Sequence, residues 1–187
     1  MMKIAILSDI HDNIWNLAAA LTAIRETETL ICCGDLCSPF IIGLLAEGFP
    51  GKPIHIVFGN NDADLFRITN NAKKYPHVHL HGEFFQGELG GQRFAVNHFD
   101  NLAQPIAASG QYDVVCYGHN HIFKIEPVGR TLTINPGAIM GYDPGQKSDI
   151  PATFVIYDTE TGVAQGYQVE SKAAGQSRRV VLYPNNG

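Results

Sequence analysis

Short apolar runs alternate with helical patterns through the first part of the chain. The segments KIAILS (3–8), TLICCGD (29–35) and PIHIVFGN (53–60) each have the composition of a buried strand. Helical spacing of apolar residues predicts helices after each of them, over 13–27, 39–47 and 63–74, with Asn13 as the cap of the first. Repetition of strand, helix and strand is typical of parallel βαβ units, so we expect an α/β fold.

The second half changes to strand-like runs separated by glycine-rich turns. One helix is expected near 100–109, two hairpins over 123–135 and 153–169, a loop over 141–150, and a last edge strand at RVVLYP after a polar stretch from 171. The other expected strands are 77–81, 83–88, 92–98 and 113–119. We therefore expect one domain, 1–187, with two packed sheets, mostly parallel early in the chain and mostly antiparallel late.

Charge and hydropathy exclude several classes of partner. The 187 residues carry a net charge of −5 without a block of Lys and Arg, so no nucleic-acid polymer is expected as a partner. No stretch reaches membrane-spanning length, and the opening apolar run, Ile4 to Leu7, is too short for a signal peptide. We expect a cytoplasmic protein that does not bind membranes, and a homo-oligomer is possible.

Four cysteines could serve as ligands or as core residues. Cys32 and Cys33 lie in a strand-like run and favour small buried thiols over a disulfide framework. A zinc site from Cys33 and Cys37 is the alternative, but the chain has no second cysteine pair to complete it.

Polar side chains follow five of the expected strands. They are the ligand-type residues Asp9, His11, Asp35, Asn60, His98, His119 and His121. Ligands of open α/β sheets collect at the carboxyl ends of strands, so these side chains can converge. The pairs D-x-H and H-x-H would place both ligands on one side of an extended backbone, and the flanking glycines allow close approach.

The number and type of these residues indicate two metal ions. Two Asp, one Asn and four His exceed the needs of one tetrahedral ion, but suit two ions if Asp35 bridges them. Imidazole and carboxylate ligands without thiolate favour Mn, Fe, Zn, Co or Ni.

In this order, the motifs resemble one known family. D-x-H at 9–11, GD at 34–35, GN-x-D at 59–62, a lone His98, GH-x-H at 118–121 and NPG at 135–137 are similar to the calcineurin-like metallophosphoesterase superfamily. The short length resembles its small bacterial and archaeal phosphodiesterase-type branch. This resemblance implies a four-layer αββα sandwich of two mixed β-sheets flanked by helices, with a dinuclear metal centre.

The resemblance also implies roles for individual residues. It places Asp9, His11, Asp35 and His121 around one ion, and Asp35, Asn60, His98 and His119 around the other. Asn135 would order the neighbouring loops. The implied function is hydrolysis of small phosphodiesters or phosphoanhydrides by a hydroxide bridging two divalent ions. Mn is the expected ion, with Fe, Zn, Ni and Co as alternatives.

Two positions depart from the family pattern. Many members have a general-acid His where this chain has Asn61, and an amide has no proton to give at neutral pH. We therefore expect Asp35, Asn60 and Asn61 at the catalytic centre, with activity biased toward good leaving groups and weak on alkyl monoesters. Asp62 would lose the role of orienting that His and is interpreted as a helix cap. Phe99 stands where a small residue is common, and either lines the pocket or packs inward.

Two alternatives remain open. A non-catalytic scaffold on the same fold, like the retromer subunit that resembles this family, would not need all seven ligands. His77, His79 and His81 alternate on one strand and favour a solvated face over a further metal patch, while His55 is interpreted as a satisfied core or edge histidine.

Overall fold

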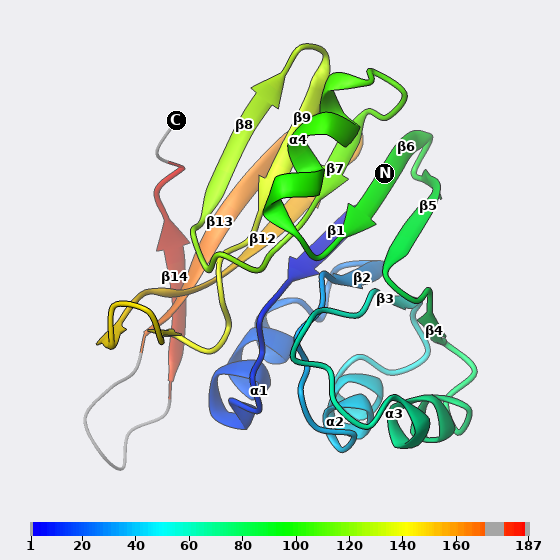
Figure 1. Cartoon of the computed structure of the whole chain (residues 1–187), viewed down its shortest axis with the longest axis vertical. Coiled ribbons are helices and arrows are strands. Elements are labelled where there is room, and N and C mark those ends of the chain that lie inside the picture. Colours follow the sequence, from blue (N-terminus) through cyan, green and yellow to red (C-terminus); the bar gives the residue numbers. More distant parts are fainter. Residues whose placement is uncertain (1, 171–177, 186–187) are drawn as a thin grey trace.

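The computed structural model describes residues 2–170 and 178–185 and contains two mixed sheets (Figure 1). The larger sheet has the order β14-β13-β12-β1-β2-β3-β4. Its parallel half consists of β1 (Lys3–Leu7), β2 (Thr29–Cys32), β3 (Ile54–Ile56) and β4 (Val78–Leu80). Its antiparallel half consists of β12 (Ala152–Asp158), β13 (Val163–Glu170) and β14 (Arg179–Tyr183).

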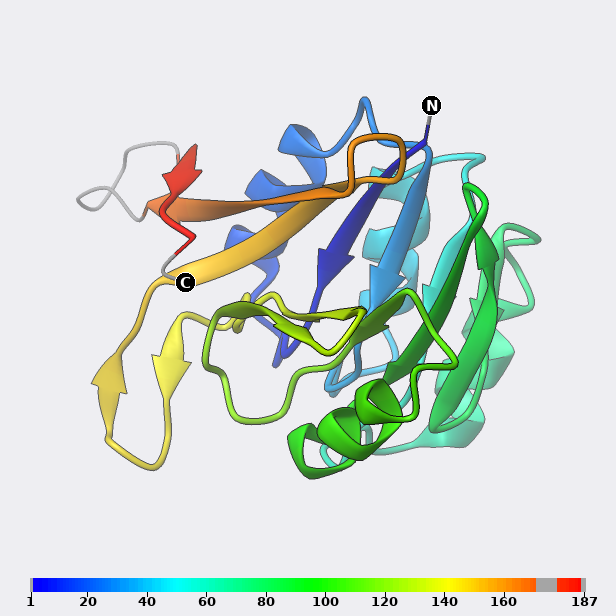
Figure 2. The same cartoon turned by 90° about the horizontal axis from the view of Figure 1, so that it is seen from above.

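The smaller sheet has the order β5-β6-β7-β9-β8. Three parallel strands, β6 (Gln92–Asn97), β7 (Val114–Cys116) and β9 (Thr131–Asn135), lie between the antiparallel edges β5 (Phe84–Leu89) and β8 (Lys124–Val128). Figure 2 shows the two sheets stacked, with helices outside them. The helices α1 (Ile14–Ala23), α2 (Ile41–Gly48) and α3 (Leu65–Ala72) pack on the larger sheet, and α4 (Asp100–Ala108) packs on the smaller one. The expected αββα sandwich is confirmed.

The distribution of strands between the sheets differs from the expected one. The division into an early parallel sheet and a late antiparallel sheet is wrong, because β12, β13 and β14 return to pair beside β1. The expected loop 141–150 is also wrong: it is a hairpin of β10 (Tyr142–Asp143) and β11 (Ser148–Asp149). The Asp143 carboxylate accepts hydrogen bonds from the Gly145 and Gln146 amides and closes its turn. The last strand, β14, is confirmed, whereas the polar stretch 171–177 lies outside the described residues.

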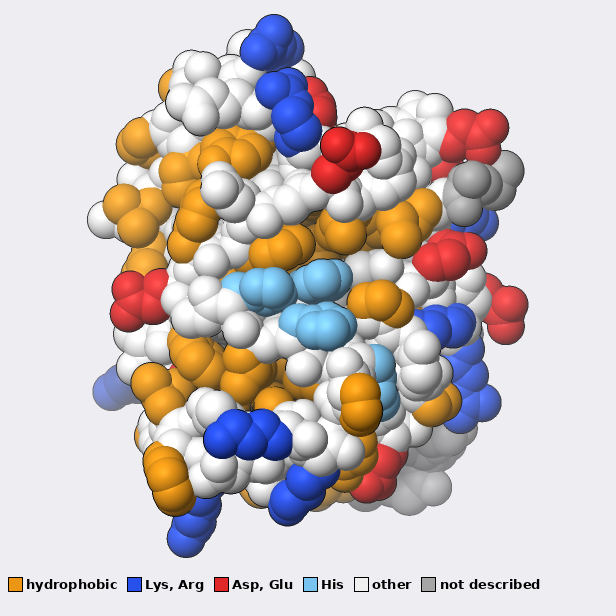
Figure 3. Space-filling model, turned by 90° about the vertical axis from the view of Figure 1, so that its right-hand side faces the viewer, with side chains coloured by type: hydrophobic (Ala, Val, Ile, Leu, Met, Phe, Trp, Pro, Cys, Tyr) orange, Lys and Arg blue, Asp and Glu red, His pale blue; other side chains and the backbone are white. Residues whose placement is uncertain are grey.

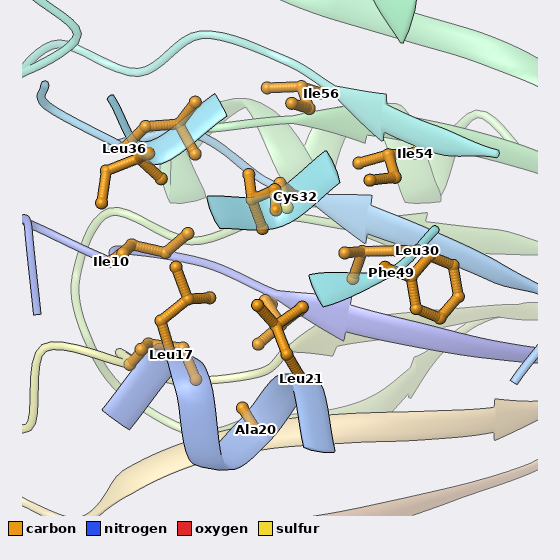
Figure 4. Close-up of a cluster of buried hydrophobic side chains, with 14 of the residues drawn as sticks. Ile10, Leu17, Ala20, Leu21, Leu30, Cys32, Leu36, Phe49, Ile54 and Ile56 are labelled. Atoms are coloured by element: carbon orange, nitrogen blue, oxygen red, sulfur yellow. The ribbon is translucent and has the colours of Figure 1, made fainter. Parts of the chain in front are cut away.

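Alternation along the strands builds two cores. On β1, Ala5 and Leu7 pack beneath the helices, while Ile4 and Ile6 pack between the sheets. Figure 4 shows the helix-side core, where Leu17 and Leu21 of α1 meet side chains of the sheet. Cys32 packs on the helix side and Cys33 between the sheets, so these neighbouring thiols face opposite ways.

Side-chain caps begin two of the described helices, α1 and α3. The Asn13 side chain accepts a hydrogen bond from the Asn16 amide and begins α1, as expected. None of the helices in the described part of the chain is long and apolar enough to cross a membrane.

Candidate metal centre

The candidate ligands lie in loops at the carboxyl ends of five strands, three from the larger sheet and two from the smaller. Backbone hydrogen bonds join these loops: the Ile10 and His11 amides donate to the Asp35 carbonyl, and the Gly118 amide donates to the His98 carbonyl. The His119 amide donates to Asp9 Oδ2 at 3.0 Å and links the two sheets. The centre therefore lies where the two sheets meet.

One group of ligand atoms gathers around Asp9, which is fully buried. Asp9 Oδ1 lies 3.3 Å from His121 Nε2 and 3.7 Å from His11 Nε2. These three side chains have the spacing of a metal site. They belong to the ligand set that the sequence predicts for the first ion.

A second group gathers around Asp35. Its Oδ2 atom lies 3.3 Å from His98 Nε2 and 3.5 Å from His11 Nε2. Asn60 Oδ1 lies 3.2 Å from His98 Nε2 and 2.9 Å from His119 Nδ1. All seven predicted residues thus come together, and Asp9 also forms a compact group with Asp35 and His98.

Three of the imidazoles contact a neighbouring group through the ring nitrogen Nδ1. His98 Nδ1 lies 2.8 Å from the Cys33 carbonyl, His121 Nδ1 lies 3.1 Å from the Tyr142 carbonyl, and His11 Nδ1 lies 3.3 Å from Cys37 Sγ. When Nδ1 donates its proton to such a partner, the lone pair of Nε2 is left free for a metal. Sequence reasoning missed Cys37 and Tyr142 in these roles, and a backbone carbonyl leaves no signal in the sequence.

The backbone of the ligands is not extended, so the expected geometry of D-x-H and H-x-H is wrong. Five ligands have left-handed φ values: 52° at Asp9, 41° at His11, 55° at Asp35, 73° at His119 and 60° at His121. Residues other than glycine rarely adopt this region, and they do so mainly where the surrounding structure imposes it at functional sites. The side chains converge because the loops turn sharply.

Glycines make room for this convergence. A Cβ atom on Gly59 would overlap the Asp35 carboxylate and lie 2.8 Å from His98 Cε1. A Cβ on Gly118 would overlap Ser8 Oγ and lie 2.5 Å from Asp9 Oδ2. The expected close approach at the flanking glycines is confirmed at these two positions.

The chemistry of the donor set fits divalent cations. Among the described residues, Asp9 Oδ1 and His11 Nε2 are buried without a hydrogen-bond partner, although they point into the same group. Burial alone would raise the pKa of Asp9, but the imidazoles of His11, His121 and His98 outweigh it and hold the pKa far below its ordinary value. An ionised carboxylate beside unpartnered imidazole nitrogen is what a bound cation needs.

Asn61 and Asp62 act on the same loops. The Asn61 side chain donates to Asp35 Oδ2 at 2.9 Å, and its backbone amide donates to Asp35 Oδ1 at 2.8 Å. Interpretation of Asp62 as a helix cap is wrong, because Asp64 caps α3. The Asp62 carboxylate instead accepts hydrogen bonds from four backbone amides, those of Asp35, Leu36, Cys37 and Gly59.

The remaining predicted residues lie at the periphery. The Phe99 ring contacts the rings of both His98 and His119, with centroids 5.2 Å apart in each pair. The side-chain Nδ2 of Asn135 donates to the Gly118 carbonyl and to Asn120 Oδ1, and its Oδ1 accepts from the backbone amide of Gly137. Cys33 packs between the sheets while Cys37 contacts His11, so these two cysteines do not face one another.

Two layered sheets collect imidazoles and carboxylates at their junction, as in a metal-binding α/β protein. A sequence model of the calcineurin-like phosphoesterase superfamily domain matches residues 2–162, and the chain belongs to this superfamily. The chain is 34% identical over 165 residues to Phosphodiesterase MJ0936 of Methanocaldococcus jannaschii, and the aligned region covers 85% of this chain and 94% of the relative.

Solved structures agree with this assignment. A structure of an archaeal phosphodiesterase superposes with a TM-score of 0.80 at 32% identity, covering 90% of this chain and 100% of the other. Vacuolar Protein Sorting 29 from Cryptosporidium parvum superposes with a TM-score of 0.69 at 17% identity, covering 97% and 96% of the two chains, and shows the fold alone. The chain is therefore a calcineurin-like metallophosphoesterase and a homologue of phosphodiesterases.

Proposed function

We propose that the chain hydrolyses small phosphodiesters, or phosphoanhydrides, that have good leaving groups, and that it depends on two divalent ions. The position of Asp35 carries this proposal. Its Oδ2 atom lies 3.5 Å from His11 Nε2 and 3.3 Å from His98 Nε2, which belong to different ligand groups. A carboxylate between two groups is suited to bridging two ions.

The proposed division of ligands is the one that the family implies. Asp9, His11, Asp35 and His121 would hold one ion, and Asp35, Asn60, His98 and His119 the other. Ions bound there would supply the Lewis acidity that activates water and neutralises phosphate charge. Mn is the proposed ion, with Fe, Zn, Ni and Co as alternatives.

The amides of Asn60 and Asn61 would have different tasks. Asn60 presents its oxygen to His98 and His119 and adds no charge to the centre. Asn61 uses its amide hydrogens to orient Asp35. Neither amide can protonate a leaving oxygen at neutral pH, so leaving groups must depart as stable anions.

A leaving-group series tests this proposal. The purified chain is stripped with a chelator, loaded with Mn²⁺ and assayed on aryl phosphodiesters of rising leaving-group pKa and on an alkyl diester. We expect kcat/KM to fall steeply along the series. Comparable turnover of alkyl and aryl esters would contradict the proposal. If the loaded chain binds fewer than one ion and hydrolyses none of the esters, the result would favour a non-catalytic scaffold.

A substitution at Asn61 sharpens the test. Asn61→His introduces a proton donor, so the slope of the series should flatten, with a gain of up to about 10²-fold on the alkyl diester. Asn61→Gln is the matched control, because it keeps an amide and should give no such gain. An equal response of both variants would argue against a missing general acid.

A further inference from the structure

A cluster of histidines lies outside the metal centre, on the edge formed by β3, β4 and β5. His55, His79 and His81 make up this edge histidine cluster, and none of them is among the seven candidate ligands. Figure 3 shows histidines side by side on this face, surrounded by hydrophobic side chains. His79 is exposed, while His55 and His81 are half-buried.

The register of the sheet builds the cluster. His55 on β3 pairs with His79 on β4, and the His81 amide donates to the Ile56 carbonyl, so the pairing continues past the end of β4. His79 and His81 are two residues apart and share a face with their cross-strand neighbour His55. The expectation that His77 shares this face is wrong: its ring packs beside Tyr75, and its Nε2 lies 3.2 Å from the Ala46 carbonyl of α2.

Two of the imidazole nitrogens, on His55 and His81, already have a spacing that an ion requires. His55 Nδ1 lies 2.9 Å from His81 Nε2, and the ring of His55 is stacked 5.4 Å from that of His79. Two nitrogens bound to one ion at about 2.0–2.1 Å lie about 2.9–3.4 Å apart for angles from 90° to tetrahedral. An ion could therefore take the place of the proton that His55 and His81 share. His79 stacks on His55 and is exposed, so its ring would have to turn toward the ion to serve as the third ligand.

The surroundings keep the rings of His55 and His81 neutral and oriented. Burial, with the neighbouring imidazoles His81 and His79, lowers the pKa of His55 to about 4, and burial also lowers the pKa of His81. Each of these two rings thus keeps one unprotonated nitrogen at neutral pH. Phe85 stacks on His55, with centroids 4.7 Å apart, and its ring is tilted against that of His81, with centroids 4.3 Å apart.

We propose that His55, His79 and His81 form a mononuclear site for a borderline divalent transition ion such as Zn²⁺, Cu²⁺ or Ni²⁺. Imidazole ligands without a carboxylate suit these ions, whereas Mn²⁺ and Mg²⁺ prefer oxygen. The site is separate from the Asp-containing centre and would differ from it in metal preference.

Metal counting on the full chain tests the proposal. Zn²⁺ is titrated into the stripped protein by calorimetry, and bound zinc is counted after dialysis. We expect His79→Ala to bind one equivalent of zinc fewer than the unmodified chain, or to bind that equivalent at least about tenfold more weakly. Even a residue that only orients a ligand contributes about 10–100-fold to metal affinity. His77→Ala is the matched control and should keep the full count.

Cu²⁺ provides a second readout that does not depend on counting. The electron paramagnetic resonance spectrum of the added equivalent should show nitrogen hyperfine structure that His55→Ala and His79→Ala both lose. The proposal is overturned if His79→Ala and His77→Ala bind equal equivalents with equal affinity and give the same spectrum. His79 is exposed, so its loss should not unfold the chain, and Mn²⁺-dependent phosphodiesterase activity should be unchanged.

Discussion

The distances between the candidate ligands depend on residues that have no side chain. Gly118 follows β7 and lies against Ser8 and Asp9 of the other sheet, so the two loops approach within hydrogen-bond distance at His119 and Asp9. Gly59 plays the same part between Asp35 and His98. Each glycine sets the separation of ligands that it does not itself provide.

Gly118→Ala should therefore disrupt the centre. The added methyl group would overlap Ser8 and crowd Asp9, so we expect loss of most Mn²⁺ binding and destabilisation of about 1–3 kcal/mol from overpacking. Calorimetric titration with Mn²⁺ and thermal unfolding measure the two effects. Gly43→Ala in α2 is the control: its Cβ would lie 3.6 Å from the Tyr75 hydroxyl, an ordinary contact, and should stabilise the helix by up to about 1 kcal/mol.

Single residues also show where sequence reasoning reaches its limit. The convergence of the seven candidate ligands was predictable because each residue type follows a recognisable strand. The role of Asp62 was not, since four amides from two separate loops surround it only in the folded chain. His55 likewise joins His79 through a register that one strand alone does not reveal.

At the scale of elements, the β10–β11 hairpin supports the metal centre. Its Tyr142 carbonyl contacts His121 Nδ1, and the adjacent Asp143 side chain closes its turn. The composition of 141–150 suggests a loop because residues typical of turns outnumber the residues of the two short strands. Two local hydrogen bonds to one side chain thus decide the structure of a segment that contacts a candidate ligand.

Removal of the hydrogen bonds that Asp143 accepts should weaken metal binding. Asp143→Ala opens the turn and loosens the support of His121, so we expect Mn²⁺ affinity to fall by about tenfold, the lower end of the cost for residues that orient a ligand. Asp158→Ala is a matched control, because Asp158 accepts the same kind of turn hydrogen bonds, from the Glu160 and Thr161 amides, at the β12–β13 turn. Equal affinity in both variants would show that the hairpin is not needed.

A second prediction concerns the junction of β6 and β7. Hydrogen bonds from Arg93 lower the pKa of Asp113 from 3.8 to about 2. Because the folded pKa is below the unfolded one, the contribution of this pair is present above about pH 4 and is lost as pH falls toward 2. Asp113→Asn should lower the urea midpoint modestly at pH 7, since both side chains are partly exposed, and the difference from the unmodified chain should close near pH 2.

Asp149→Asn removes the same charge from an exposed position and controls for net charge. Its urea midpoint should match that of the unmodified chain at both pH values. A gap for Asp113→Asn that persists at pH 2 would mean that the ion pair is not its cause.

At the scale of the whole molecule, the candidate centre lies where two sheets meet, and apolar side chains pack between these sheets. Its candidate ligands come from loops after β1, β2 and β3 on one side and after β6 and β7 on the other. Ions held by both sides would bind the folded chain and not the unfolded one. The layered fold was predictable from the alternating elements, but the return of β12 to β1 was not, because pairing between the ends of a chain has no local signal.

Metal removal should therefore lower stability as well as activity. At an Mn²⁺ concentration of 100 Kd, one bound ion adds about 2.7 kcal/mol to the free energy of unfolding. We expect Tm to rise with added Mn²⁺ and to fall again with chelator, and Asp35→Asn to lose most of this response. A Tm that is independent of Mn²⁺ would show that the folded chain does not bind the ion.

The left-handed backbone conformation of five candidate ligand residues limits how this centre could be transferred to another protein. Five side chains reach their positions only because their loops adopt a left-handed backbone that is uncommon for residues other than glycine. Copying the seven residues onto a host sheet with ordinary loops would place the same atoms in different directions. A designer who wants this chemistry elsewhere must graft the loops with their dihedral angles and glycines, and can choose the strands beneath them freely.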